Sequence, residues 1–556
     1  MTAPTSPASP ASDLYGDPLL AHAPRVLGMM DREALSPTSG CCDRTYWAWK
    51  FVDMPAPRFQ EALCFLSYLY ATPLGDGRYT GRAKMLEWIE AGLRYWCGLQ
   101  HRDGSFDEAY PFERSLAATA FSSFYVAEAL GFLDSHVSPT TRQQVLETLD
   151  RAARWLVRND ETHGVLSNHL AAAAAASHHA YRLLDRQAYA DRSAHFCGRI
   201  ISRQSSEGWY EEYGGPDPGY QTHGSFYLVR LWQLNGDEVL AGSLRRAMRF
   251  LAECVHPDGS IGGEYASRDT KTYYPAAFEM FAPHDDAAAW IASVMRPSVS
   301  SGTAAGLHGV DAHNYFPFLN NFAFAHGAAA DPPLPAPKLP PPLPEFRWFP
   351  EAGLAIRRTP SYTAYVGTSK GGVVHVYDTH GRSPMRSDCG YVGRTHRGKL
   401  VSTQYLDPTR PVTAGEGKVE VRGAVALVSR PTMAPFRFLG FRVFSLTVGR
   451  WAPVGRWLKR LLVRLLIYRR TTMRIAFRRV VTFTNDGVTV HDELIGPDGA
   501  ALDGLHGSDV FTSIHMGSAR YFVPSELGGR EPAPADAIPG AEIVSGVTRS
   551  RHLSLG

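Results

Sequence analysis

Several features that assign a protein to a compartment are missing from this sequence of 556 residues. Residues 1–13 are rich in Pro, Ser, Ala and Thr, and they have neither the basic start nor the apolar stretch of a secretory signal. No run of 18 uncharged apolar residues occurs, which argues against a transmembrane helix. We therefore expect a disordered segment at 1–13 and a cytoplasmic protein.

Cysteine is scarce as well. The chain has seven cysteines, an odd number, and they are scattered along its length. This pattern argues against a disulfide framework. Cys41 and Cys42 are adjacent, but no further residue stands at metal-ligand spacing from them, so we expect reduced thiols and no metal site.

Acidic residues are absent from one long stretch. Between Val421 and Asn485 there is no Asp or Glu, whereas fourteen Arg and Lys residues occur there, although the net charge of the whole chain is only +3. Within this stretch, 450–470 is expected to be a basic amphipathic insertion, because 456–470 has helical periodicity with Trp457 and leucines opposite the cations. The cations on one face are Arg456, Lys459, Arg460 and Arg464.

Such a helix is typical of a protein that lies on an anionic membrane, here the inner face of the cell membrane. The alternative is a helix that packs its leucine face on its own domain. A nucleic-acid partner is not expected, because no recognised nucleic-acid-binding pattern occurs.

Most of the first three fifths of the chain has helical periodicity, and 14–328 is predicted to form an α/α toroid, complete or incomplete, of helix hairpins. An acid-Gly turn follows several of the helical segments, with glycines at 104, 164, 208 and 259, a spacing of about 50 residues that is typical of hairpin repeats. The predicted helical segments are 58–69, 81–99, 114–133, 139–159, 169–184, 189–204, 220–234, 238–255 and 274–295.

A proline-rich linker at 329–345 ends this domain, and beyond it the apolar period changes to two. The second domain, 346–556, is therefore predicted to be an antiparallel β-sandwich, so the fold class is α+β with two domains. Residues 547–556 show no obvious closing strand. The predicted strands are 354–358, 362–367, 373–377, 418–422, 478–484 and 487–494.

The repeated turns also carry aromatic and acidic side chains, which suit a sugar-binding cleft, because aromatic faces stack on pyranose rings and carboxylates accept hydroxyl hydrogen bonds. Paired carboxylates could instead make a glycoside hydrolase, or could only cap loops. A terpene cyclase is disfavoured because the Asp-rich motif is absent. The expected substrate-binding residues are Trp47, Trp49, Asp107, Glu108, Trp209, Glu212, His223, Glu264, Arg268 and Arg386.

Three short pieces resemble the heparinase II/III-like polysaccharide lyases and related alginate lyases, whose fold is a toroid followed by a β-sandwich. Asn168-His169 opens an Ala-rich helix, Tyr220 follows about fifty residues later, and 371–375 continues to an Asp-x-Gly turn at 388–390. The sequence departs from the family at His375, whose spacing to Asp378 is one residue longer than the usual His-x-Asp.

The resemblance implies β-elimination of an acidic, uronate-containing glycan without a cofactor. Asn168 and His169 would neutralise the uronate carboxylate, and Tyr220 would move the proton. His375 would act as a second base or carboxylate clamp, with Arg268 or Arg386 adding positive charge. Combined with the basic stretch, this suggests an envelope or exopolysaccharide enzyme acting on a polysaccharide or lipid-linked glycan. A non-catalytic glycan-binding protein is the remaining alternative, since Asn168 could be a helix cap and His375 an ordinary sheet residue.

Overall fold

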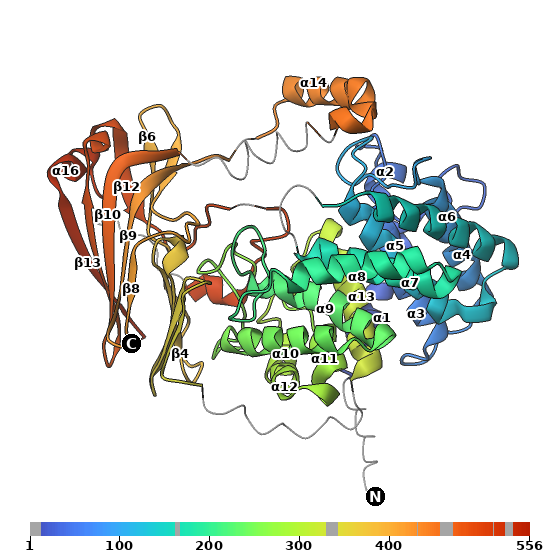
Figure 1. The fold of residues 1–556 in the computed structure, drawn as a ribbon, viewed down its shortest axis with the longest axis horizontal. Coiled ribbons are helices and arrows are strands. Elements are labelled where there is room, and N and C mark those ends of the chain that lie inside the picture. Colours follow the sequence, from blue (N-terminus) through green and yellow to red (C-terminus); the bar gives the residue numbers. More distant parts are fainter. Residues whose placement is uncertain are drawn as a thin grey trace, which may run out of the picture.

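The computed structural model describes residues 13–161, 167–329, 343–430, 432–455, 457, 471–514, 516–528 and 537–555. A helical domain and a β-domain lie side by side, and loops of each reach the other (Figure 1). Some predicted features lie outside the described residues, namely Gly164 and the four basic residues Arg456, Lys459, Arg460 and Arg464.

The helical domain runs from α1 to α13. Its helices are α1 (Gly16–Met29), α2 (Arg44–Trp47), α3 (Ala62–Ala71), α4 (Ala83–Gly98), α5 (Leu116–Leu133), α6 (Pro139–Arg158), α7 (Ser167–Leu184), α8 (Gln187–Ile201), α9 (Pro218–Asn235), α10 (Glu238–Glu253), α11 (Ala276–Phe281), α12 (Asp286–Ser301) and α13 (Ala312–Ala328), with the 3-10 turn η1 (Pro57–Glu61) before α3. The segment predicted as one helix at 274–295 is two, because Pro283 has no amide hydrogen with which to continue α11.

Helices α5, α7 and α9 form the inner layer. Residues 116–136 are long and apolar enough to cross a membrane, but in the 18-residue window with a mean hydropathy of 1.4, 89% of the residues are buried inside the fold. The alanines that open α7 let it pack closely against α5, α8 and α9. By contrast, α6 and α10 bury one face only, as expected for outer helices. The long apolar sequence of α5 is therefore explained by its position in the inner layer of the toroid.

The repeated acid-Gly turns lock neighbouring hairpins together. The turn glycines Gly104, Gly208 and Gly259 have φ of 97°, 104° and 81°, a region that side chains rarely adopt. A Cβ atom at Gly104 would overlap the carbonyl oxygen of Arg151, and one at Gly208 would overlap that of Arg246. These positions require glycine because a helix backbone lies directly against the turn.

A glutamine before two of these turns makes the same bridge each time. The side-chain amide of Gln100 donates to the carbonyl of Thr148 at 2.9 Å, and that of Gln204 donates to the carbonyl of Ser243 at 2.9 Å. The apolar residue after each turn points into the core rather than toward a sugar; these residues are Phe106, Trp209 and Ile261. The main role of the repeated turns is therefore to pack neighbouring helix hairpins together.

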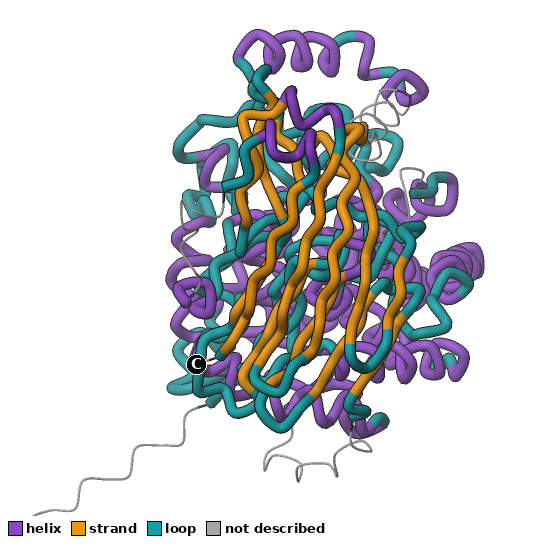
Figure 2. The backbone as a smooth tube through the Cα atoms, turned by 90° about the vertical axis from the view of Figure 1, so that its left-hand side faces the viewer, coloured by secondary structure: helices purple, strands orange, loops and turns teal. Residues whose placement is uncertain are grey.

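The β-domain consists of two antiparallel sheets. One contains β1 (Phe346–Phe349), β2 (Leu354–Arg358), β3 (Tyr362–Gly367), β4 (Val373–Asp378) and β5 (Arg386–Asp388) in that order. The other, shown in Figure 2, has the order β12 (Leu502–Gly507), β6 (Tyr391–Thr395), β7 (Leu400–Ser402), β9 (Lys418–Val428), β10 (Thr471–Phe483), β11 (Gly487–Ile495), β13 (Val547–Ser554), with β8 (Val412–Ala414) beside β9.

Side chains of the two sheets share one core, in which Val366 and Val374 meet Val421 and Val490. The predicted fold class, a toroid followed by an antiparallel sandwich, is therefore confirmed. The sequence left the end of the chain open, and the structure places β13 there, which closes the second sheet by pairing along β11. Its polar outward residues hide the apolar alternation that identifies a half-buried strand.

Two segments of the β-domain return to the toroid. Residues 508–528, between β12 and α16 (Gly540–Ser545), reach the toroid loops, where the amide of Arg520 donates to the carbonyl of Asp269 at 2.8 Å. The insertion between β9 and β10 carries α14 (Pro435–Leu446), which lies beside α2 at the toroid edge (Figure 1). An ion pair of 2.9 Å between Arg442 and Asp53 joins them.

Candidate active site

The start of α9 is organised by a buried ion pair. Asp217 caps the helix, because its Oδ1 accepts the amide of Tyr220 at 3.1 Å. Its other oxygen accepts Nε of Arg268 at 2.5 Å, and both side chains are almost completely buried. A buried pair with good hydrogen bonds holds its partners in one geometry. The pair therefore fixes Tyr220 and Arg268 relative to each other.

Arg268 lies between two tyrosine rings. Its guanidinium carbon is 4.4 Å from the ring centroid of Tyr220 and 4.7 Å from that of Tyr213. Such cation–π contacts are attractive and strengthen away from water. Tyr213 has φ of 55°, a conformation that a non-glycine residue keeps only where its surroundings impose it. Sequence reasoning identified Tyr220 and Arg268 but missed Tyr213.

The N-terminus of α7 is held by an acid from the following repeat. The backbone amide and the side-chain amide of Asn168 both donate to Oε1 of Glu212 at 2.9 Å. Burial raises the pKa of Glu212, while Arg268 and the two Asn168 hydrogen bonds oppose that rise. Asn168 and Glu212, predicted separately, thus form one unit next to Arg268.

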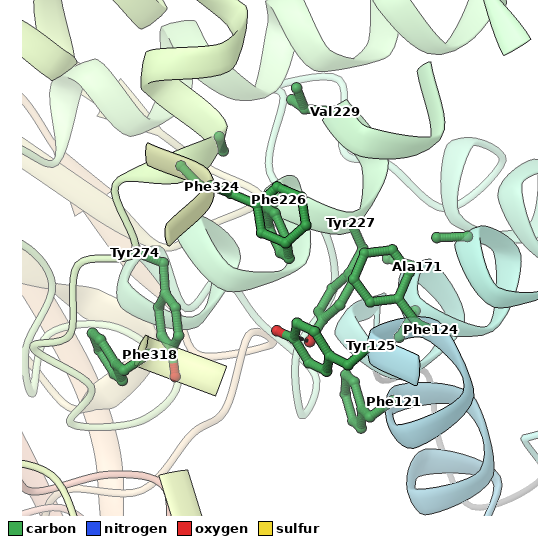
Figure 3. Packing of buried hydrophobic residues seen from close by; sticks show 14 of the residues in the cluster. Phe121, Phe124, Tyr125, Ala171, Phe226, Tyr227, Val229, Tyr274, Phe318 and Phe324 are labelled. Carbon is green, nitrogen blue, oxygen red and sulfur yellow. Dashed lines mark hydrogen bonds between the residues drawn. The ribbon is translucent and has the colours of Figure 1, made fainter. Parts of the chain in front are cut away.

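His223 follows Tyr220 by one helical turn, and their ring centroids are 5.6 Å apart. It stacks on Tyr274 at 4.2 Å, and its Nε2 is 2.9 Å from the hydroxyl of Tyr227. Figure 3 shows Tyr274 beside Phe318 and Tyr227 among the aromatic residues of α5 and α9. Burial, with help from the nearby Arg58 and His169, lowers the pKa of His223 well below 6.5, so its imidazole is neutral.

Tyr220 has the opposite character. Burial raises the pKa of its phenol above 10.0, and the cations Arg268 and Arg58 and the hydroxyl of Ser518 reduce that rise without cancelling it. The phenol is therefore protonated at neutral pH. Ser518 comes from the β-domain, and its hydroxyl also lies 3.3 Å from Nη1 of Arg268.

Arg58 supplies a second cation that sequence reasoning missed. It lies over the ring of Phe121 at 4.3 Å and forms ion pairs with Glu61 and, at 3.1 Å, with Glu108. Burial raises the pKa of Glu61 to about 7 despite the Arg58 contact. The predicted residue Glu108 is thus connected to the cluster by its ion pair with Arg58.

Four buried polar atoms in this region have no hydrogen-bond partner among the described residues. They are Oδ1 of Asn168, Oε2 of Glu212, Nδ1 of His223 and Nη2 of Arg268. Buried polar groups in folded proteins are nearly always paired, with protein or with water. Several unpaired atoms around one tyrosine are what a site for a polar ligand presents.

Of the remaining predicted residues, His169 borders the cluster, near enough to His223 to lower its pKa, whereas Asp107 lies in its own loop. His169 is half-buried, with Nδ1 3.3 Å from Oε2 of Glu161, and its ring meets Phe121 edge-on at 5.6 Å. Asp107 accepts the amides of Phe112 at 2.7 Å and Arg114 at 2.9 Å, which organises its own loop. Its carboxylate is therefore engaged inside the protein.

The predicted aromatic platforms differ in exposure. The indole of Trp47 donates to the carbonyl of Met29 at 2.8 Å, and that of Trp209 donates to Glu207 at 2.9 Å, so both serve local packing. Trp49 is 61% exposed and stacks on Phe51, outside the cluster described above.

His375 is not brought to the cluster around Tyr220. Its side chain is completely buried, 3.2 Å from Oε2 of Glu264, and Lys271 lies 3.3 Å from the same acid. Cys389 completes a set of potential ligand atoms within 4.8 Å of one another. Lys271 already neutralises Glu264 and lowers the pKa of that acid, and burial raises the pKa of the Cys389 thiol, so the set fits a buried ion-pair cluster better than a metal site.

Arg386 lies in a separate hollow of the β-domain. This hollow has a volume of about 400 Å³ and is lined also by Arg551 and His552. Arg551 is occupied by ion pairs with Asp388 at 3.0 Å and Asp492 at 2.5 Å. Arg386 therefore belongs to a different part of the molecule from Arg268.

Comparison with known proteins points to the polysaccharide lyases. Residues 53–277 match the family model of the ulvan lyase N-terminal domain. The Streptomyces coelicolor A3 chondroitin AC lyase in complex with chondroitin sulphate superposes with a TM-score of 0.54 at 12% identity, over 91% of this chain and 69% of that chain. A Paenibacillus xanthan lyase gives a TM-score of 0.52 at 8% identity, over 88% of this chain and 46% of that chain. No curated protein matches the sequence.

The matched range of the ulvan lyase model contains every toroid residue of the cluster, from Arg58 to Arg268. The structural matches extend the likeness across both domains, at identities that establish the fold. The predicted resemblance is thus confirmed as a likeness: residues 53–277 match the model of the ulvan lyase N-terminal domain, and the whole chain shares the toroid-plus-sandwich fold of the chondroitin AC lyase.

Proposed function

We propose that this protein is a carbon–oxygen lyase that cleaves a uronate-containing polysaccharide by β-elimination. The observation that carries the proposal is the set of unpaired buried atoms around Tyr220 on Asn168, Glu212, His223 and Arg268. They include a cationic donor, a carboxyl oxygen, an amide oxygen and a neutral imidazole nitrogen. A sugar acid offers a matching combination of carboxylate, hydroxyls and a removable proton.

The first requirement of the reaction is a neutralised carboxylate, because the C5 proton becomes acidic only when the adjacent carboxylate charge is offset. Nη2 of Arg268 provides a charged donor for it. Glu212 adds a second donor only at pH values where it is protonated, and Arg268 offsets the carboxylate charge over the rest of the pH range. Both groups gain strength as charge builds up on the carboxylate in the transition state.

The second requirement is a base and an acid on the reacting atoms. We assign the base to His223, which is neutral and has Nδ1 unpaired, and the acid to Tyr220, whose phenol is protonated. Nδ1 takes the C5 proton, the electrons of that C–H bond form the C4–C5 double bond, the C4–O bond breaks, and the phenol protonates the leaving oxygen. Return of the proton from His223 to Tyr220 restores the enzyme.

This assignment changes the role that the resemblance implied for Tyr220. A phenol whose pKa is raised is a poor base until it has lost its proton, whereas it is ready to donate one. His375 contacts Glu264 rather than the residues around Tyr220, so we give it no role in the proposed step.

Chondroitin, xanthan and ulvan, the glycans named for the similar proteins, contain uronate, which supports an acidic glycan as substrate. We also propose a place in envelope or exopolysaccharide metabolism at the inner face of the cell membrane, with a polysaccharide or lipid-linked glycan as substrate. The acid-free stretch 421–485 supports this part of the proposal. A hydrolase is less well supported, because Asp107 and Glu264 are engaged in internal contacts.

Incubation with a panel of uronate polymers tests the reaction. A lyase creates an unsaturated sugar that absorbs in the near ultraviolet, in step with new reducing ends. New reducing ends without this absorbance would identify a hydrolase, and binding without either signal would identify a glycan-binding protein. Both of these results would overturn the proposal.

A further inference from the structure

The helix α14 exposes most of its apolar side chains. Phe436 is 88% exposed, Leu439 60% and Val443 55%, and Trp451 just beyond the helix is 70% exposed. Large apolar residues scattered singly over a surface are ordinary, but a group of this kind marks an interaction site. Other large apolar residues exposed in the same segment are Met433, Phe438, Leu446 and Val448.

The opposite side of α14 is fastened to the toroid. Phe441 meets Tyr110 edge-on at 4.8 Å, and Arg442 pairs with Asp53 at 2.9 Å. Residues 436, 439, 443 and 446 follow helical spacing and form one outward stripe. The helix is therefore anchored along one side while its apolar stripe faces away from the molecule.

A second exposed apolar group comes from the toroid at the same place. Trp49 and Phe51 are 61% and 79% exposed, their rings stack at 5.8 Å, and Val52 is exposed beside them. The next residue, Asp53, holds Arg442 of α14. Two segments from different domains thus meet at one edge, where Figure 1 shows α14 beside α2. We name the stripe of α14, Trp451 and residues 49–52 the apolar edge.

The charges at the apolar edge are positive. Arg437 is exposed on α14, and Lys50 is exposed between Trp49 and Phe51. No acid occurs between Val421 and Asn485. Aromatic and aliphatic side chains flanked by Arg and Lys are the combination that settles at the headgroup level of an anionic bilayer.

We propose that the apolar edge inserts shallowly into the anionic leaflet of a membrane. Phe436, Leu439 and Val443 enter the boundary between headgroups and acyl chains, while Arg437 and Lys50 contact lipid phosphates. This membrane contact is distinct from the predicted one at 456–470, and it holds the protein by two domains at once. It does not depend on the proposed lyase reaction.

Co-sedimentation of the whole protein with vesicles tests this inference. We expect binding to vesicles that contain phosphatidylglycerol and little binding to pure phosphatidylcholine, with a blue shift of tryptophan fluorescence on binding. A variant with Phe436→Ser, Leu439→Ser and Val443→Ser should bind at least about tenfold more weakly, because three buried apolar side chains are lost. An Arg437→Glu, Lys50→Glu variant should bind more weakly and lose the lipid preference.

A matched control replaces exposed apolar residues elsewhere, Leu35→Ser with Val239→Ser, which are 95% and 68% exposed. This control should bind vesicles as the unaltered protein does, and all variants should keep its circular dichroism and its activity on soluble polymer. The inference is overturned if the unaltered protein binds neither vesicle, if the triple variant binds equally well, or if the triple variant instead converts a dimer into a monomer in light scattering.

Discussion

Asp217 and Arg268 form an ion pair of 2.5 Å in which both side chains are almost inaccessible to water, and the same carboxylate caps the helix that carries Tyr220. One side chain thus sets the position of the proposed acid and of the proposed carboxylate-binding cation. Asp217 touches no substrate in the proposed reaction, so it is a positioning residue. Its importance should appear first in stability.

Replacing Asp217→Asn should lower the free energy of unfolding by about 3–5 kcal/mol. Asparagine caps a helix as well as aspartate does, so the loss comes from leaving the Arg268 charge buried without its partner. Urea denaturation followed by circular dichroism measures it. The control is Asp237→Asn at the exposed start of α10, where the change should be close to zero. Equal losses at the two positions would contradict the buried-pair argument.

The change Tyr220→Phe should lower kcat by about 10²–10⁴-fold with little change in KM. The ring that stacks on Arg268 remains, and only the proton donor is lost. A substrate with a leaving group that needs no proton should recover much of the rate. The control Tyr213→Phe keeps the other stacked ring, and its kcat should stay within a few-fold of that of the unaltered enzyme. Full activity of the Tyr220→Phe variant on ordinary polymer would show that Tyr220 is not the acid.

The pH profile of kcat/KM should have its acid limb below pH 6.5 and its alkaline limb above pH 10. His223 must be neutral, and because burial lowers its pKa below 6.5, protonation stops the reaction only at lower pH. Tyr220 must be protonated, and its raised pKa keeps it so until above pH 10. The rate of the double-bond absorbance across pH measures both limbs.

The control is His195→Asn on the outer helix α8, a half-exposed histidine whose loss should leave the profile unchanged. His223→Asn should reduce the rate by about 10²-fold or more at every pH, because no base remains at that position. An acid limb at or above pH 6.5 in the unaltered enzyme would mean that His223 is not the base.

Gly208→Ala should destabilise the toroid by about 1–3 kcal/mol. The position combines a φ of 104° with a helix carbonyl, that of Arg246, in the space that a Cβ atom would take. Gly131→Ala is the control, because this glycine lies in the exposed last turn of α5 with open space around it, and alanine there should stabilise by about 0.5–1 kcal/mol. Thermal unfolding compares the two. A neutral Gly208→Ala would show that the turn is not tightly packed.

Periodicity was sufficient to predict most of the architecture. Helical spacing located α4 to α10, and alternation located β2, β3, β4 and β11 to within a few residues. It failed at β13, whose outward residues are polar, and at α11 and α12, where one proline divides a continuous apolar pattern. Local sequence predicts the type of a helix or strand well, but it gives little information about a boundary that depends on tertiary packing.

The site was predictable in part. The cluster consists of residues that were all named from sequence, namely Asn168, Glu212, Tyr220, His223 and Arg268. Tyr213 and Arg58 were not, because their roles arise from ring stacking and buried ion pairs that no local pattern announces. His375 stands in a motif that resembles a lyase strand, yet its neighbours Glu264 and Tyr265 enclose it. A motif identifies the residue type, whereas the tertiary contacts decide which cluster the residue joins.

Ser518 reaches Arg268 across 250 residues of sequence, within a loop that leaves the sandwich and returns to the toroid. During synthesis the residues of the toroid are therefore made long before the loop that adds Ser518 to the proposed site. A nascent chain halted after Ala328 would hold Tyr220 and His223 but would lack the hydroxyl that contacts both Tyr220 and Arg268. The proposed reaction would therefore have its full set of contacts only after the second domain has folded back onto the toroid.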